Sequence, residues 1–113
     1  MRHLVPAILV LVVLVAVPAV AEGPSEGEEL FLAQKCNLCH AVPPADIEAK
    51  TRSDKLRGSD LGLEPLPPFE EVAAYLRGET EIDGEKHKKK VTADDAELKK
   101  IVDWLNELAE SQG

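Results

Sequence analysis

The chain has 113 residues, of which 44% are hydrophobic, only 4% are aromatic and two are cysteines. Its 21 acidic residues outnumber its 13 basic residues, so the formal net charge is −8. This balance argues against a nucleic-acid-binding protein, because phosphate recognition needs a basic surface. A chain of this length forms one small domain, and such domains bury too little surface to be comfortably stable without help from disulfides, metals or partners.

The N-terminal segment has the pattern of an export signal. Arg2 provides a positive start, residues 4–17 are apolar apart from one proline, and Ala19-Val20-Ala21 is a small-residue cleavage site. We therefore predict a signal peptide over residues 1–21 and a periplasmic domain over residues 22–113. Loss of Arg2 would leave 12 basic and 21 acidic residues, a net charge of −9. The alternative is an uncleaved anchor that holds the domain at the outer side of the cytoplasmic membrane, since the apolar stretch is near the lower limit for a membrane span.

Three helices are predicted in the exported part. The first opens at Ser25, which can form a capping box with Glu28, and runs toward the cysteines. The second starts at Pro68 and stops at Gly78. The third begins near Thr92 and has the strongest helical pattern, formed by Leu98, Ile101, Val102, Leu105 and Leu108 with Trp104 beside them. The aromatic residues Phe31, Phe69, Tyr75 and Trp104 are interpreted as packing residues.

Two long segments separate these helices. Residues 41–67 are rich in Pro, Gly, Asp and Ser and have no sustained periodicity, and residues 79–91 form a polar loop. A structureless segment as long as the first is improbable in a small domain unless it wraps around something. No alternating strand pattern is visible, so the sequence predicts an all-α domain.

The segment Cys36-Asn37-Leu38-Cys39-His40 carries the clearest chemical signal. Two thiols separated by two residues can add to the two vinyl groups of a haem, and the adjoining histidine can then coordinate the iron. One covalently bound haem would also supply the apolar bulk that the small core lacks. We therefore predict Cys36 and Cys39 as haem attachment sites and His40 as the proximal iron ligand.

Three other interpretations of this segment are possible. A structural zinc site would need Cys36, Cys39, His40 and His87 together, without the paired ligand spacing of a zinc module. A thioredoxin-like dithiol would need a βαβ setting, which no strand pattern provides. A disulfide between Cys36 and Cys39 would close too small a loop to stabilise the fold much. Export, helix placement and the small core all favour haem.

Over residues 22–113 the chain resembles class I c-type cytochromes. Gly27 and Phe31 look like the glycine and aromatic pair of that family's first helix, and Ile101 and Trp104 look like the matching pair of its last helix. The resemblance implies a small cytochrome c-like fold, in which three main helices and long loops surround the haem and the first and last helices cross at Gly27. The run from residue 57 to 61 resembles the family's proximal loop, with Ser59 where a proline is usual, which leaves its backbone contact to His40 as a point to check.

The resemblance also identifies a departure at the second axial position. Most members of the family use a methionine in the loop before the last helix, but the only methionine here is Met1. His87 lies in the corresponding loop and is the only unused histidine of the exported domain, so we predict that it is the distal iron ligand. A lysine ligand, Lys86 or Lys88, and a vacant position are the alternatives. A second imidazole in place of a thioether should lower the reduction potential.

These features together predict a monomeric one-electron carrier that exchanges electrons with redox partner proteins and is not an enzyme. One alternative is a haem-based sensor or small-gas binder with a weak or open distal site, and another is the cytochrome subunit of a larger periplasmic oxidoreductase. The basic run Lys86, Lys88, Lys89 and Lys90 either guides an acidic partner to the haem edge or is a solvated loop that compensates nearby negative charge.

Overall fold

The structure is a computed structural model in which residues 10–13 and 25–112 are described. It contains three α-helices, α1 (Glu26–Ala33), α2 (Phe69–Leu76) and α3 (Asp95–Gln112), and two short 3₁₀ turns, η1 (Cys36–Leu38) and η2 (Pro43–Ala45). The described residues form no β-strand beyond two isolated bridges. The all-α prediction with three main helices is therefore confirmed. No helix in the described ranges is long and apolar enough to cross a bilayer, and most of the predicted signal, residues 1–21, lies outside these ranges.

Local signals in the sequence set the helix ends. The Ser25 Oγ accepts the N–H of Glu28 at 3.2 Å and so caps α1. Helix α2 ends in a Schellman motif, because Gly78 has a φ of 75° and the N–H of Glu79 bonds the Ala74 carbonyl at 2.9 Å. The predicted stop at Gly78 is confirmed.

Two helices begin later in the sequence than predicted. Pro68 is the N-cap residue of α2 and not its first helical residue. The third helix begins at Asp95 and not near Thr92, because Asp94 and Glu97 form the capping box. The Asp94 carboxylate accepts the Glu97 N–H at 2.8 Å, and the Glu97 carboxylate accepts the Asp94 N–H at 3.4 Å.

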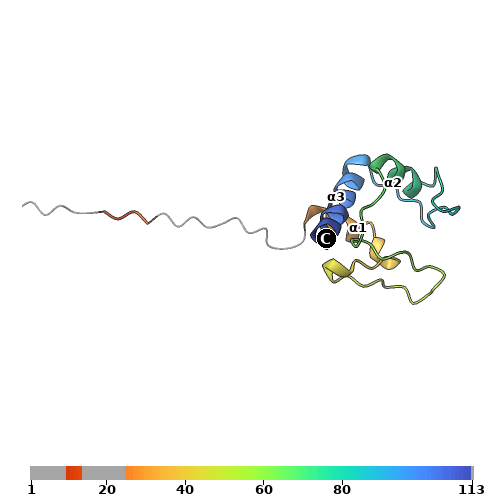
Figure 1. Cartoon of the computed structure of the whole chain (residues 1–113), viewed down its shortest axis with the longest axis horizontal. Coiled ribbons are helices and arrows are strands. Elements are labelled where there is room, and N and C mark those ends of the chain that lie inside the picture. Colours follow the sequence, from red (N-terminus) through yellow and green to blue (C-terminus); the bar gives the residue numbers. More distant parts are fainter. Residues whose placement is uncertain (1–9, 14–24, 113) are drawn as a thin grey trace, which may run out of the picture.

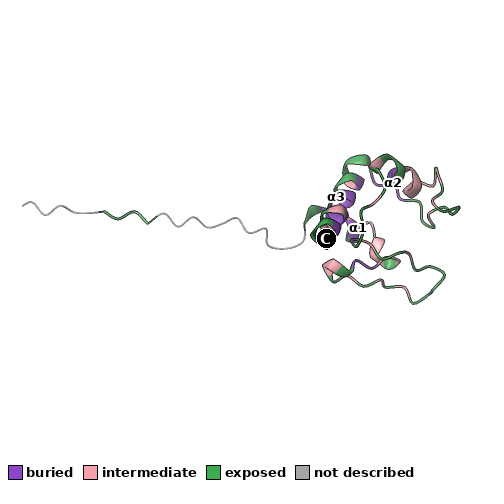
Figure 2. Ribbon diagram, in the orientation of Figure 1, coloured by how far each residue is buried: buried purple, intermediate pink, exposed green. Residues whose placement is uncertain are grey.

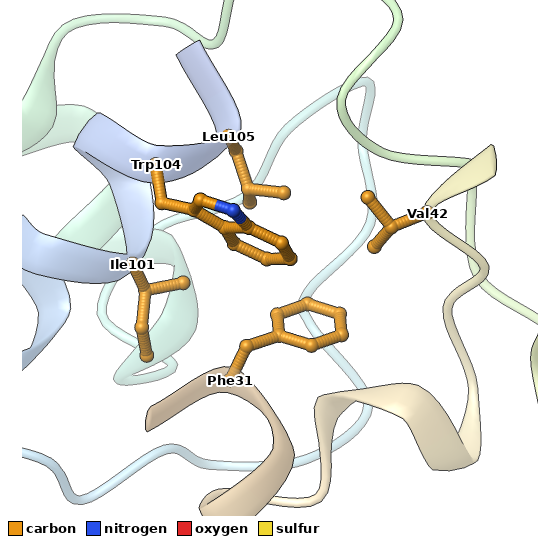
Figure 3. Close-up of a cluster of buried hydrophobic side chains, with 5 residues drawn as sticks. All are labelled: Phe31, Val42, Ile101, Trp104 and Leu105. Atoms are coloured by element: carbon orange, nitrogen blue, oxygen red, sulfur yellow. The ribbon is translucent and has the colours of Figure 1, made fainter. Parts of the chain in front are cut away.

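Helices α1 and α3 cross at Gly27, as the resemblance implied. A Cβ atom at Gly27 would collide with the Lys100 carbonyl and with the Trp104 Cβ, so only glycine permits this approach. Next to the crossing, the rings of Phe31 and Trp104 pack with their centroids 5.5 Å apart (Figure 3). We call the buried group around them the α1–α3 cluster; it consists of Phe31, Val42, Ile101, Trp104 and Leu105.

A second apolar group, the α2–α3 cluster, lies at the other end of α3. It consists of Ala73, Val91, Ala93 and Leu98, with Phe69 and Leu76 packed against it. The interior is therefore divided into two small groups of buried side chains and has no single continuous core. The side chains of both groups are almost fully buried.

Two long loops extend to the same side of α3 in the view of Figure 1. The loop over residues 41–67 follows η1, and the loop over residues 79–91 follows α2. Both are mostly exposed or half-buried, whereas the buried residues gather where the helices meet (Figure 2). The longer loop is hydrogen-bonded to α3, because the Asn106 Oδ1 accepts the Leu66 N–H at 2.9 Å. The shorter loop carries His87, and the longer loop directly follows His40.

Candidate functional site

Cys36, Cys39 and His40 lie together in one tight turn after α1. Lys35, with a left-handed φ of 61°, redirects the chain at the end of the helix. The Cys36 carbonyl then accepts the N–H of Cys39 at 3.3 Å and that of His40 at 3.0 Å. Both thiols are free and half-buried. The turn thus gathers the three predicted groups in a segment that has little freedom to separate them.

The His40 ring is fixed by the loop over residues 41–67. Its Nδ1 lies 2.6 Å from the Ser59 carbonyl oxygen. Because a carbonyl can only accept a hydrogen bond, Nδ1 carries the proton and Nε2 keeps its lone pair free. Gly58 lies directly against this ring, and a Cβ at that position would overlap the imidazole. The backbone contact to His40, which the serine at position 59 had left open, is therefore made, because it uses the carbonyl and not the side chain.

The surroundings of the site favour the uncharged forms of two of its groups. Burial holds the pKa of His40 below its usual value, and the facing His87 acts in the same direction. Burial also raises the pKa of the Cys36 thiol, against the opposing effect of the Lys89 charge. A raised thiol pKa is the opposite of what activates a redox dithiol, so the thioredoxin-like interpretation receives no support from it.

His87 is presented by the loop over residues 79–91. That loop begins as a tight hairpin, in which Asp83 and Gly84 have φ values of 52° and 80° and Ile82 pairs with Glu85. Positive φ at both central residues matches a type I′ turn. The His87 Nδ1 lies 2.5 Å from the Lys89 carbonyl oxygen, so this ring also has its proton on Nδ1 and a free Nε2.

The two imidazoles face one another across the site, although 47 positions separate them in the sequence. Their ring centroids are 6.1 Å apart and their planes differ by only 8°. This separation is too large for contact stacking. Two imidazoles that bind one metal ion from opposite sides, at about 2.0–2.1 Å each, have their centroids about 6 Å apart. The centroid separation of His40 and His87 therefore matches that of two imidazoles on opposite sides of one metal ion.

The described side chains alone do not complete the coordination of such an ion. The parts of the chain that the structure describes contain no group of three or more His, Cys, Asp or Glu side chains that could hold a metal ion. A structural zinc site would need such a group. A haem supplies four nitrogen ligands of its own and needs only two from the protein. The residues present therefore fit a haem better than a metal ion alone.

The sequence interpretation missed three residues that shape this site. Tyr75 was interpreted only as a packing residue, but its ring meets the edge of His87 at a centroid distance of 5.4 Å. Lys89 was treated only as part of a basic run, although it bonds the His87 ring through its backbone. Gly58 was noted only as part of the loop motif. The Asp83-Gly84 pair could have predicted the hairpin that precedes His87. No local sequence pattern marks the contacts of Tyr75, Lys89 and Gly58 with the histidine rings.

Comparison with known proteins adds no relative to this picture. No protein-family model matches the chain, and no curated protein or solved structure matches it either.

Proposed function

We propose that this protein is an exported monohaem c-type cytochrome that acts as a one-electron carrier. The observation that carries the proposal is the pair of facing imidazoles, 6.1 Å apart and nearly parallel, next to the free thiols of Cys36 and Cys39.

Cys36 and Cys39 would hold the haem covalently. Each thiol would add across one vinyl group, which would form a carbon–sulfur bond and transfer the thiol proton to the other vinyl carbon. The bound haem supplies an iron that alternates between the ferrous and ferric states. The turn that contains both thiols also contains His40, so attachment and proximal ligation are set by the same short segment.

His40 and His87 would both bind the iron of the haem. The protein would then keep both imidazoles in place while the charge of the iron changes, and no side chain would need to act as an acid, base or nucleophile. Each Nδ1–H donates to a backbone carbonyl, which makes the opposite nitrogen a stronger donor. We therefore expect a reduction potential below that of a comparable histidine–methionine cytochrome.

Absorption spectroscopy tests the proposal most directly. The mature protein, produced in cells that attach haem to exported chains, should give a reduced-minus-oxidised spectrum of low-spin haem without the far-red sulfur-to-iron band. Its colour should stay with the polypeptide after denaturation and extraction with acidified organic solvent. The variant Cys36→Ala/Cys39→Ala is the control and should lose its colour on extraction. Extraction of all the colour from the unaltered chain would falsify covalent attachment.

Potentiometric titration tests the axial chemistry separately. The His87→Met variant serves as the matched control, because it restores the family's usual ligand type at the same position. We expect its potential to lie above that of the unaltered protein. Equal potentials in the two proteins would count against a second imidazole as the ligand that sets the potential.

A further inference from the structure

Lys89 connects the loop of His87 to the segment that holds the thiols. Its Nζ donates to the Gln34 carbonyl at 3.1 Å, across 55 positions of sequence. Its own carbonyl accepts the Nδ1–H of His87 at 2.5 Å. A single residue therefore contacts the distal histidine through its backbone and the end of α1 through its side chain.

The end of α1 is suited to receive this lysine. The last carbonyls of a helix lack partners within the helix, and they carry the negative end of the helix dipole. Helix α1 has no basic residue in its own last turn, and Gln34 is its C-cap residue. Lys89 therefore supplies, from a distant loop, the cation and the donor that this helix end lacks. Because Gln34 precedes Cys36 by two positions, the bond joins the distal loop directly to the haem-attachment turn.

The neighbouring lysines do not share this role. Lys86, Lys88 and Lys90 are exposed, as Lys89 is, but within the described residues their side chains make no hydrogen bond or salt bridge. Lys89 thus differs from them in the hydrogen bond that its side chain makes with the Gln34 carbonyl, and not in its charge.

We propose that Lys89 is a positioning residue that keeps His87 opposite His40 by holding the distal loop against the end of α1. This inference rests on the proposed function, since the position that His87 occupies matters only if a haem iron lies between the two rings. Loss of the Nζ–Gln34 bond should leave the fold intact and increase the fraction of time in which the loop is open. An external ligand could then reach the iron more often.

Carbon monoxide binding to the reduced, haem-loaded protein measures this opening. The test compares Lys89→Gln with Lys90→Gln, which removes the same charge from the same loop without removing a bond. At low salt we expect Lys89→Gln to bind carbon monoxide about two- to fivefold faster than the unaltered protein, the range that one exposed charge–dipole contact supports. Lys90→Gln should bind at the unaltered rate. Added salt should narrow the difference between Lys89→Gln and the unaltered protein, because it screens the contact in the latter.

A rescue variant and a ligand variant separate the ways in which the inference could fail. Lys89→Arg keeps a charged donor for the Gln34 carbonyl and should bind carbon monoxide at nearly the unaltered rate, with thermal unfolding as the check on folding. Equal rates for the two glutamine variants, or an arginine variant as fast as Lys89→Gln, would overturn the role of Lys89. An unchanged low-spin spectrum in His87→Ala would instead remove His87 from the iron, and this second result concerns the proposed function itself.

Discussion

The two halves of the candidate site hold their histidines by different means. His40 belongs to a tight turn, lies against the backbone at Gly58 and is followed by Val42, which is fully buried in the α1–α3 cluster. His87 lies in an exposed loop, and its ring is bonded to a carbonyl only two positions away. The His40 side is thus fixed by packing in addition to its bond to the Ser59 carbonyl, whereas the His87 side is fixed by polar contacts and one aromatic ring. If this difference governs the site, changes on the proximal side should abolish the haem site, whereas changes on the distal side should alter ligand exchange.

The largest expected contrast is between the two histidines themselves. His40→Ala should abolish or severely reduce the yield of haem-loaded protein, because the proximal turn loses its ligand. His87→Ala should retain the covalently attached haem but convert its spectrum from low spin to high spin. Absorption spectra and haem yield per polypeptide check both outcomes. Similar yields and similar spectra in the two variants would show that the halves are equivalent.

Two glycines provide the next contrast. Gly58→Ala places a Cβ within the His40 ring, so we expect a loss of about 3 kcal/mol or more in the free energy of unfolding, together with an altered spectrum. Gly84 also has a positive φ, but a Cβ there meets nothing within 4 Å. Gly84→Ala should therefore lower the free energy of unfolding by only about 1–2 kcal/mol, from backbone strain. Denaturant unfolding of the haem-loaded proteins measures both values.

Two buried valines provide a smaller contrast, which separates an effect on the free energy of unfolding from an effect on carbon monoxide binding. Val42 follows His40 by two positions and is 0% exposed, and Val91 follows Lys89 by two positions and is 6% exposed. Either change to alanine should lower the free energy of unfolding by about 2 kcal/mol through lost burial and a small cavity. Only Val91→Ala should also accelerate carbon monoxide binding, because it loosens the chain next to the distal loop. An equal acceleration in Val42→Ala would contradict this separation.

The contact of Tyr75 with His87 should give the smallest effect. An aromatic pair at this distance contributes about 0.5–1.5 kcal/mol beyond the area it buries. Tyr75→Leu should therefore increase the carbon monoxide binding rate by about two- to tenfold. Tyr75→Phe keeps the ring and should remain near the unaltered rate. Stopped-flow measurements on the reduced proteins distinguish the two variants, and a matching acceleration in Tyr75→Phe would assign the effect to the hydroxyl group.

Much of the fold could be predicted from the sequence, because its signals are local. Ser25 and Gly78 mark helix ends through contacts within a few residues, and the period of apolar residues in α3 identifies its buried face. The start of α3 was misplaced because Thr92 and Asp94 are competing caps a short distance apart. Only Asp94 has a glutamate three positions later to complete the capping box.

The candidate site was predictable in its residues but not in its geometry. The thiol pair and the adjoining histidine form a contiguous motif, and the single remaining histidine of the domain was easy to single out. The 6.1 Å separation of the rings, in contrast, depends on how two loops fold back onto α3. The contact at Ser59 could not be inferred from its side chain because it is made by the backbone. The bond from Lys89 to Gln34 spans 55 positions and has no sequence signature.

The crossing of α1 and α3 at Gly27 also sets an order of events during folding. The salt bridge between Lys100 and Glu26 joins positions 74 residues apart, so almost the whole domain must be available before these helices meet. Closing so long a loop is slow compared with forming a single helical turn. The turn that contains Cys36 and Cys39 can therefore form first and remain accessible while the final helix is still arriving. Under the proposed function, a haem would be attached to the two thiols in that interval, before α1 and α3 come together.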